Sequence, residues 1–501
     1  MSMQRCHSRA SIVGFVLLTA ACGGSAASGG SGSGSGSATV GGKAIKTAGG
    51  QAVSQEAHNR WTEGLKLFKL YDTKGGWTSA HCDDAAGKFE DAAGAQAKFA
   101  EALYMAGLSN DRCGNRDKAQ KFYGDAIRAN PKFCKARVAI ALEHLRTGQS
   151  SQAEREFAQS VQDDPQCTEG YVNLAIMQRK RGIEGNKEAL SNLRRALAID
   201  AQYLPAFNEM ALLYLSEAAD NTKKLDLAEV VCSQAQKINA NYAAVYNTWG
   251  LIDLRRDKII DAAAKFQKAM ELDNKMFEAY MNFARITIGF RGYQDAKTAY
   301  EKALALQPKN FDAQIGIGVA LRGLQDNANA QVAYEKAMKL DPSRAEPYYN
   351  IGLLYQDFMN GTADEMKKAR TYYQDFLAKA GSDKRYAVAV EDVTRKCKVE
   401  GGKKRGSSRS KCIAGRLQNI DLYLDTMKQM AEMEKLQKEQ EKQAAALEAQ
   451  EKKDAEKAAA EAKAHPPAAP PADAKKPAAG DAAPAAAPAK DATAAPKGKD
   501  K

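Results

Sequence analysis

A pattern that repeats every 34 residues constrains the fold of this chain more than any other feature. Pro131 and Pro165 are 34 residues apart, and so are Pro308 and Pro342. Before each proline a small residue stands 12 positions back, an aromatic residue stands eight back, and usually another small residue stands five back. The pattern recurs at Ala119, Tyr123, Ala126; Ala153, Phe157, Ser160; Ala262, Phe266, Ala269; Ala296, Tyr300, Ala303; and Ala330, Tyr334, Ala337. Such a period predicts stacked units that bury their apolar faces against one another.

The residue types predict what each unit is. Small residues let two antiparallel helices approach closely, the aromatic residue fills the space between neighbouring pairs, and the proline ends the second helix. These units resemble tetratricopeptide repeats, and Tyr246, Trp249 and Gly250 carry the matching signature of the earlier half of a unit. The resemblance implies an all-α fold, a right-handed superhelical solenoid of antiparallel helix pairs.

The repeats divide the middle of the chain. Eight of them are expected over residues 100–382, with a degenerate N-terminal helix pair at 51–99 and a capping helix at 383–396 that closes the other end. The repeats are expected to begin near Ala100, Cys134, Thr168, Leu204, Ala243, Phe277, Phe311 and Ala345.

The N-terminus has the composition of an export signal. Residues 1–21 combine two arginines, no acid and an apolar stretch, which predicts a signal peptide. The sequence Leu18-Thr19-Ala20-Ala21-Cys22 resembles a bacterial lipobox, which implies that Cys22 is acylated and becomes the first mature residue. The glycine after it resembles the outer-membrane sorting preference. Residues 22–50 would then form the lipid anchor and a flexible Gly/Ser linker. An ordinary secretory signal, cut after a small residue such as Ala27, is the alternative.

The C-terminal part is polar. From Lys396 to Arg416 there are eight lysines or arginines and one acid, so residues 397–416 are expected to form a basic loop. Residues 417–464 contain neither proline nor glycine and predict a long charged helix. The tail at 465–501 is rich in alanine, proline and lysine, which predicts a disordered end.

Seven cysteines remain after the signal and Cys22, too many for an exported protein to leave reduced by accident. In the repeat frame Cys82 and Cys113 lie in two successive units, and Cys134 and Cys167 lie at successive junctions between units. Cys397 and Cys412 bracket the basic loop. We therefore predict the disulfides Cys82–Cys113, Cys134–Cys167 and Cys397–Cys412, and a buried free thiol at Cys232.

The repeat resemblance also implies a ligand-binding surface. In the family the first helices line an inner groove, where ligands are read at positions two, five, nine, twelve and thirteen of each repeat. This frame implies an apolar groove with a series of arginines, suited to a peptide with apolar anchors and acidic residues. Packing of several of these side chains against neighbouring helices is the alternative. The groove set is Val138, Leu142, Val172, Ile176, Arg179, Asn208, Leu212, Asn247, Leu251, Met281, Arg285, Ile315, Val319, Arg322, Tyr349 and Leu353.

Composition excludes several function classes. The apolar run from Ala10 to Ala21 is the longest and is too short for a bilayer span, so a polytopic membrane protein is excluded. The net charge of +12 is dispersed, without the basic, aromatic-laced face expected for nucleic-acid binding. No catalytic set, cofactor motif, metal site or small-molecule site emerges from the sequence. The chain is therefore expected not to be an enzyme.

The layout of lipid anchor, tether, solenoid and Ala/Pro tail resembles the tetratricopeptide lipoproteins of myxobacteria, in particular those of the adventurous gliding-motility complex. The resemblance implies an interaction scaffold on the periplasmic face of the outer membrane. It would contact other envelope proteins through its groove and the membrane through its lipid, and it would lie close to peptidoglycan. The alternatives are a pilotin-like repeat lipoprotein for assembly of the type IV pilus secretin, and a cell-wall-associated factor that recruits peptidoglycan enzymes.

Overall fold

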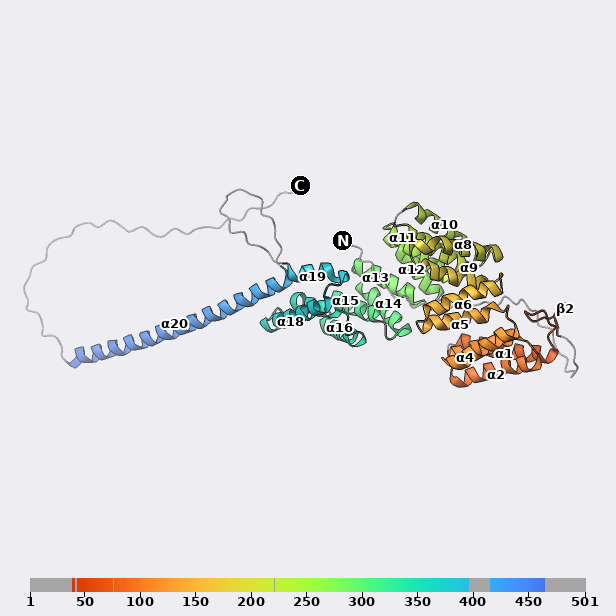
Figure 1. Cartoon of the computed structure of the whole chain (residues 1–501). Coiled ribbons are helices and arrows are strands. Elements are labelled where there is room, and N and C mark those ends of the chain that lie inside the picture. The colour runs from red at the N-terminus through yellow and green to blue at the C-terminus, as the bar shows by residue number, and fades with distance from the viewer. Residues whose placement is uncertain (1–37, 41–42, 75, 220, 396–414, 465–501) are drawn as a thin grey trace, which may run out of the picture. The chain divides into compact units, whose positions relative to one another are not determined.

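The computed structural model describes residues 38–40, 43–74, 76–219, 221–395 and 415–464 (Figure 1). The chain divides into two units, residues 1–421 and 422–501. None of the helices in the described segments is long and apolar enough to cross a bilayer.

Antiparallel helix pairs form the first unit, which confirms the predicted helical solenoid (Figure 1). The first helices of the eight repeats begin at seven of the predicted residues, and the eighth begins one residue later. They are α3 Ala100–Arg112, α5 Cys134–Arg146, α7 Thr168–Arg179, α9 Leu204–Glu217, α11 Ala243–Arg255, α13 Phe277–Gly289, α15 Phe311–Gly323 and α17 Glu346–Leu353. The second helices are α4 Arg116–Ala129, α6 Ser150–Asp163, α8 Ile183–Ile199, α10 Lys223–Ile238, α12 Ile259–Leu272, α14 Tyr293–Leu306, α16 Asn327–Leu340 and α18 Ala363–Ala380. A further pair, α1 Gln55–Lys74 and α2 Ser79–Ala95, precedes them.

Glycine and an aromatic ring meet inside each of several pairs. A Cβ atom on Gly250 would lie 2.7 Å from the ring of Phe266, and one on Gly318 would lie 2.4 Å from the ring of Tyr334. Both rings are fully buried. Because carbon atoms pack at about 3.5–4.0 Å, only a residue without a side chain fits at these two positions. This contact explains why the repeat pattern pairs a glycine on the first helix with an aromatic residue on the second.

A small β-hairpin precedes the helices, and it corrects the prediction that the flexible linker extends to residue 50. Strands β1 Thr39–Val40 and β2 Lys43–Ala44 pair antiparallel, and Lys46 bridges to Ala52. The backbone N–H of Ala38 donates to the carbonyl of Val53, and the N–H of Ile45 donates to the carbonyl of Ala38, both at 2.8 Å. Val53 is fully buried in a cluster with Ile45, on the first helix pair. Burial of these apolar side chains orders a segment that its glycine content had marked as a linker.

The last repeat departs from the regular pattern. Helix α17 continues as a π-helical turn, η1 Leu354–Phe358, and the predicted capping segment forms a 3₁₀ turn, η2 Lys384–Tyr386, followed by α19 Ala387–Thr394. Helix α20, Arg416–Ala464, begins one residue before the predicted start.

Arg416 therefore belongs to a helix instead of the basic loop. Within the first unit its guanidinium binds Gln356 at 2.9 Å, Asp357 at 2.8 Å and Asp392 at 2.5 Å, and Ile420 is buried one turn later. These contacts anchor the first turn of α20 on the last repeat.

Candidate functional site

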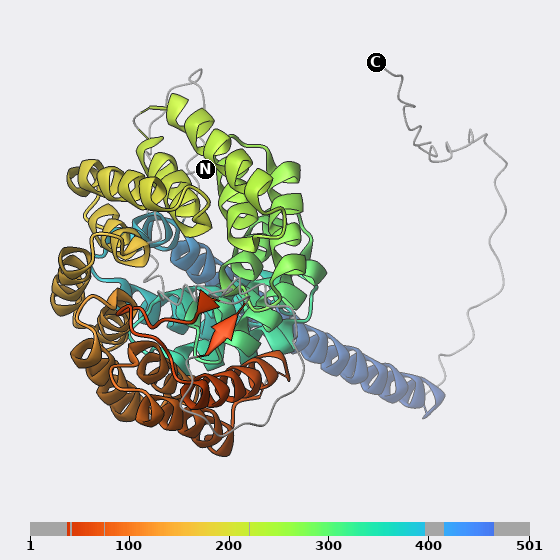
Figure 2. The same cartoon turned by 90° about the vertical axis from the view of Figure 1, so that its right-hand side faces the viewer.

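The first helices of the repeats line the inner face of the solenoid. Helices α5, α7, α9 and α11 contact one another in succession, and so do α13, α15 and α17, whereas the second helices do not pack against each other to a comparable extent. In a curved stack the elements that touch lie on the inside of the curve. Figure 2 shows the pairs of the first unit following one another around a superhelix.

The structure divides the predicted groove residues by accessibility. Val138, Val172 and Met281 are buried, so they support the fold and offer little surface to a ligand, which corrects that part of the expected set. All three occupy the fifth position of their repeats, although the fifth-position residues Asn208, Asn247, Ile315 and Tyr349 are partly exposed. Arg285 is exposed, and the other members are partly exposed: Leu142, Ile176, Arg179, Asn208, Leu212, Asn247, Leu251, Ile315, Val319, Arg322, Tyr349 and Leu353.

Position nine of the repeats forms an apolar row along this face. Six of its partly exposed members are aliphatic: Leu142, Ile176, Leu212, Leu251, Val319 and Leu353. Because these residues repeat at equivalent positions on successive helices, they form a stripe that runs across the repeats. Arg285 replaces the aliphatic residue in the sixth repeat.

Amide and hydroxyl groups connect successive first helices beside this row. The Thr248 hydroxyl donates to Asn208 at 2.7 Å, and Asn282 donates to Asn247 at 3.0 Å. Each bond joins one repeat to the next, so two of the predicted polar groove residues already have partners within the fold. These bonds fix the spacing of the inner helices, since each orients a side chain between two of them.

Two of the three predicted groove arginines also have partners. Arg179 forms an ion pair of 2.9 Å with Glu209, and Arg322 donates to Asn350 at 3.3 Å. Arg322 also lies 5.3 Å from the ring centre of Phe358. The expected arginine series therefore reduces to one exposed member, Arg285, which makes no hydrogen bond or ion pair with any residue that the structure describes.

The chain's own segments contact both ends of the groove. The backbone N–H of Ala48 in the N-terminal hairpin donates to Glu101 at position two of the first repeat. At the other end the Tyr349 hydroxyl donates to Asp392 of α19 at 2.9 Å. Tyr349 was predicted to face a ligand, and here it contacts the cap. The open part of the row consequently lies in the repeats between these ends.

Two disulfides link neighbouring repeats. Cys82 bonds to Cys113, and Cys134 bonds to Cys167, the same pairs that the repeat frame predicts. Cys134 is the first residue of α5 and Cys167 directly precedes α7, so their bond joins two successive repeats at the starts of their inner helices. Cys397 and Cys412 lie outside the described residues, and their pairing stays a prediction. Cys22 lies outside them as well.

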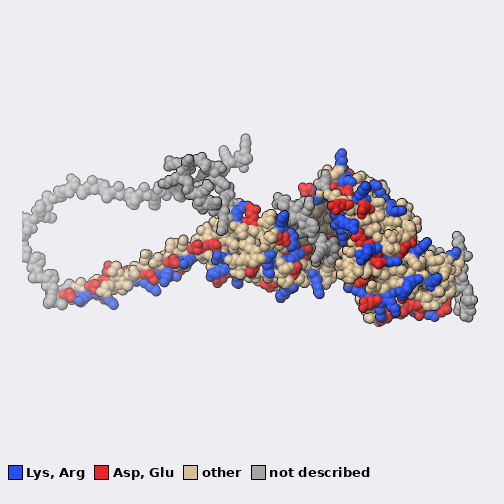
Figure 3. All heavy atoms as spheres, viewed as in Figure 1, with Lys and Arg blue, Asp and Glu red and all other residues tan. Residues whose placement is uncertain are grey.

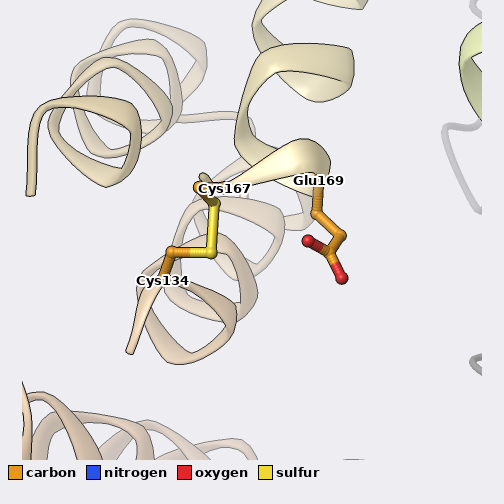
Figure 4. A group of neighbouring side chains, drawn as sticks. All are labelled: Cys134, Cys167 and Glu169. Carbon is orange, nitrogen blue, oxygen red and sulfur yellow. A yellow bond between two sulfur atoms is a disulfide. The ribbon is translucent and has the colours of Figure 1, made fainter. Parts of the chain in front are cut away.

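A carboxylate lies beside the second disulfide. Among the described residues, Cys134, Cys167 and Glu169 bring a possible ligand atom each within 4.8 Å of one another (Figure 4). The two sulfur atoms are bonded to each other and therefore offer no thiolate to a metal. Glu169 instead lies 3.7 Å from Lys135, in an ion pair between successive repeats.

The buried thiol has no disulfide partner among the cysteines that the structure describes. Cys232 is the free cysteine of the described residues, and it occupies the aromatic position of α10. Burial raises its pKa to about 12, with smaller contributions from Glu229 and Asp253. It is therefore a packing residue with an unreactive thiol.

Sequence reasoning missed the hairpin and the Arg416 cluster. The hairpin had a signal, because Gly41-Gly42 between short apolar segments is typical of a two-residue turn. Arg416 had none, since its three partners come from distant parts of the sequence. Figure 3 shows that Lys and Arg are interspersed with Asp and Glu on the visible face of the first unit, in line with a dispersed charge.

Several solved structures resemble this chain. A thermophilic TPR protein of Thermus thermophilus is 22% identical and covers 38% of this chain and 99% of its own, with a TM-score of 0.35. Cut9 with Hcn1, from the APC/C, is 14% identical over 59% and 55%, with a TM-score of 0.46. YrrB, described as a TPR protein with an unusual peptide-binding site, is 17% identical over 38% and 95%, with a TM-score of 0.29.

No curated protein matches the sequence. A family model described as a tetratricopeptide repeat matches residues 100–133 and 311–344. Each match begins at an inner helix, α3 or α15, and ends at the start of the next one. The chain therefore contains tetratricopeptide repeats at residues 100–133 and 311–344, and the other six helix pairs of the series have the same order of a first and a second helix.

Proposed function

We propose that this chain is a non-enzymatic protein–protein interaction scaffold. It is anchored through Cys22 to the outer membrane, faces the periplasm, and assembles or stabilises an envelope machine such as a gliding-motility complex. The single observation that carries the scaffold function is the aliphatic row at position nine. A water-exposed row of this kind, continued over successive inner helices, favours a bound segment that covers it.

Two features support the envelope location. The N-terminal 21 residues have the pattern of an export signal, and Cys22 follows it. The disulfides Cys82–Cys113 and Cys134–Cys167 are of a kind that persists in oxidising compartments. Both favour a protein that works outside the cytoplasm.

The scaffold function can be tested by site-specific photocrosslinking in cells. A photoreactive residue at Leu251, on the inner helix α11, should crosslink to a defined partner, since this side chain is partly exposed in the row. Val230 is the matched control, because it is an exposed aliphatic residue on the second helix α10. Equal crosslinking from both positions, or none from Leu251, would contradict a ligand in the groove.

The anchor can be tested by labelling cells with an alkyne fatty acid and comparing the wild type with Cys22→Ser. We expect the label and outer-membrane residence to be lost together in the variant. Unchanged fractionation of Cys22→Ser would refute the anchor and leave a secreted or wall-associated scaffold.

Deletion of the gene separates the processes served. Loss of surface gliding with intact pili is the expected result. Loss of secretin multimers would instead favour the pilotin-like function, and retention of the purified chain on peptidoglycan would favour the wall-associated one.

A further inference from the structure

One cation interrupts the aliphatic row of the groove. Leu251, Arg285 and Val319 occupy position nine of three successive repeats, exactly one period of 34 residues apart. Helix α13, which carries Arg285, is joined to α11 by the Asn282–Asn247 hydrogen bond of 3.0 Å and contacts α15 directly. A ligand that covers Leu251 and Val319 therefore passes over Arg285.

This guanidinium is available to a ligand. Arg179 and Arg322, the other groove arginines, are held by Glu209 and Asn350. Arg285 is exposed and has no such partner among the residues that the structure describes. An apolar segment laid across it would desolvate the charge without compensation, which is unfavourable unless the segment brings an acceptor. The row therefore selects for an acidic group at this position.

Helix α13 carries a second charged residue. Glu278 is exposed and lies two turns before Arg285 on α13, with the buried Met281 between them in the sequence. Partial desolvation by neighbouring protein atoms raises the pKa of Glu278, and Asp273 contributes to the same direction. The helix therefore carries a negative charge near its start and a positive charge at position nine, which favours an acidic ligand group at Arg285 and disfavours one displaced toward Glu278.

The spacing of the helices defines the ligand further. Helices in contact, such as α13 and α15, lie about 8–10 Å apart, and an extended peptide advances about 3.3 Å per residue, so the step from Arg285 to Val319 corresponds to about three residues. We propose that the groove binds an extended peptide segment in which an Asp or Glu faces Arg285, an apolar residue about three positions away on one side faces Val319, and an apolar residue on the other side faces Leu251. This proposal rests on the proposed scaffold function.

Selection of peptides on the full chain, with its disulfides intact, tests the proposal. A phage-displayed library of random 12-residue peptides would be selected in parallel on the wild type, Arg285→Glu, Arg285→Lys and Arg194→Glu. The wild type and Arg285→Lys should enrich an acidic residue flanked by apolar residues, with a spacing of about three on the side that faces Val319. Arg285→Glu should enrich Lys or Arg at the position of the acidic residue instead. Arg194→Glu is the matched control, since it reverses an exposed charge on the second helix α8, away from the first helices.

The affinity of the protein for one enriched peptide is then measured. Replacement of its acidic residue by Gln should weaken binding to the wild type by roughly three- to tenfold, measured by fluorescence polarisation, and should not weaken binding to Arg285→Glu. Circular dichroism would verify that each variant is folded. An acid preference that persists in Arg285→Glu, or its absence in the wild type, would overturn the proposal.

The outcomes separate this proposal from the scaffold function. Peptides that are enriched on the wild type and lost on Leu251→Glu, but show no acidic preference, would leave the groove as a peptide site and refute the role of Arg285. Failure to enrich any peptide that depends on Leu251 would refute both.

Discussion

Replacement of Gly318 by alanine tests the packing rule on which the repeats depend. The new methyl group would lie 2.4, 2.6 and 2.9 Å from three carbon atoms of the Tyr334 ring. The ring is fully buried and is held on all sides, so it cannot move aside by the roughly 1 Å that a normal contact needs without disturbing its neighbours. Overpacking of this kind costs about 1–3 kcal/mol, beyond the roughly 1 kcal/mol that alanine gains over glycine in a helix.

With the gain of roughly 1 kcal/mol subtracted from the overpacking cost of about 1–3 kcal/mol, we expect a net loss of up to about 2 kcal/mol, localised at α15 and α16. Thermal unfolding followed by circular dichroism should show a lower transition, and hydrogen exchange should show faster exchange in these two helices than elsewhere, since repeat proteins unfold in parts. Gly87→Ala in α2 is the control, because a Cβ there meets nothing within 4 Å. It should gain about 0.5–1 kcal/mol. A Gly318→Ala variant as stable as Gly87→Ala would refute the reasoning.

Three further predictions concern the cysteines and the last repeat. Cys232 should resist iodoacetamide in the native protein at pH 8 and react after unfolding. Because its pKa in the folded protein, about 12, lies above the ordinary value of 9.0, the contribution of Cys232 to stability should decline as the pH rises from about 9 to about 12. Peptide mapping without reduction should find Cys397 joined to Cys412, since a 2.8 Å backbone hydrogen bond from Gly415 to Arg395 holds the two ends of the basic loop together. Two free thiols in protein from the native compartment would contradict this. Arg416→Ala should accelerate hydrogen exchange in the first turn of α20 at a stability cost of about 1 kcal/mol, and unchanged exchange there would show that the ion pairs do not hold the turn.

The fold was accessible from the sequence because its determinants are local and periodic. Gly250 and Phe266 mark one helix pair, and Gly107 with Tyr123 and Gly318 with Tyr334 mark two others at the same interval, so these repeats support one another's assignment. The disulfides follow from the same frame. Cys134 and Cys167 are 33 residues apart, so they occupy equivalent places on neighbouring units and come within bonding distance.

The site was harder to predict from the sequence, since the exposure of its side chains and their ion pairs depend on tertiary contacts. Nothing in the sequence distinguishes Val172, which is buried, from Ile315, which occupies the same fifth position of its repeat and is partly exposed. The sequence also does not show that Arg179 forms an ion pair with Glu209, whereas Arg285 is exposed. The identity of the residue at a groove position is therefore predictable from the period, whereas its availability to a ligand requires the structure.

The two ends of the solenoid are covered by segments that are not repeats. The hairpin closes the first helix pair through Val53, and α19 with the first turn of α20 closes the last repeat through Val393 and Ile420, all of them buried. A second molecule could stack on either end only by displacing these segments, so the two closures disfavour end-to-end growth. Duplication or loss of interior units would alter the length of the inner face while leaving both closures intact.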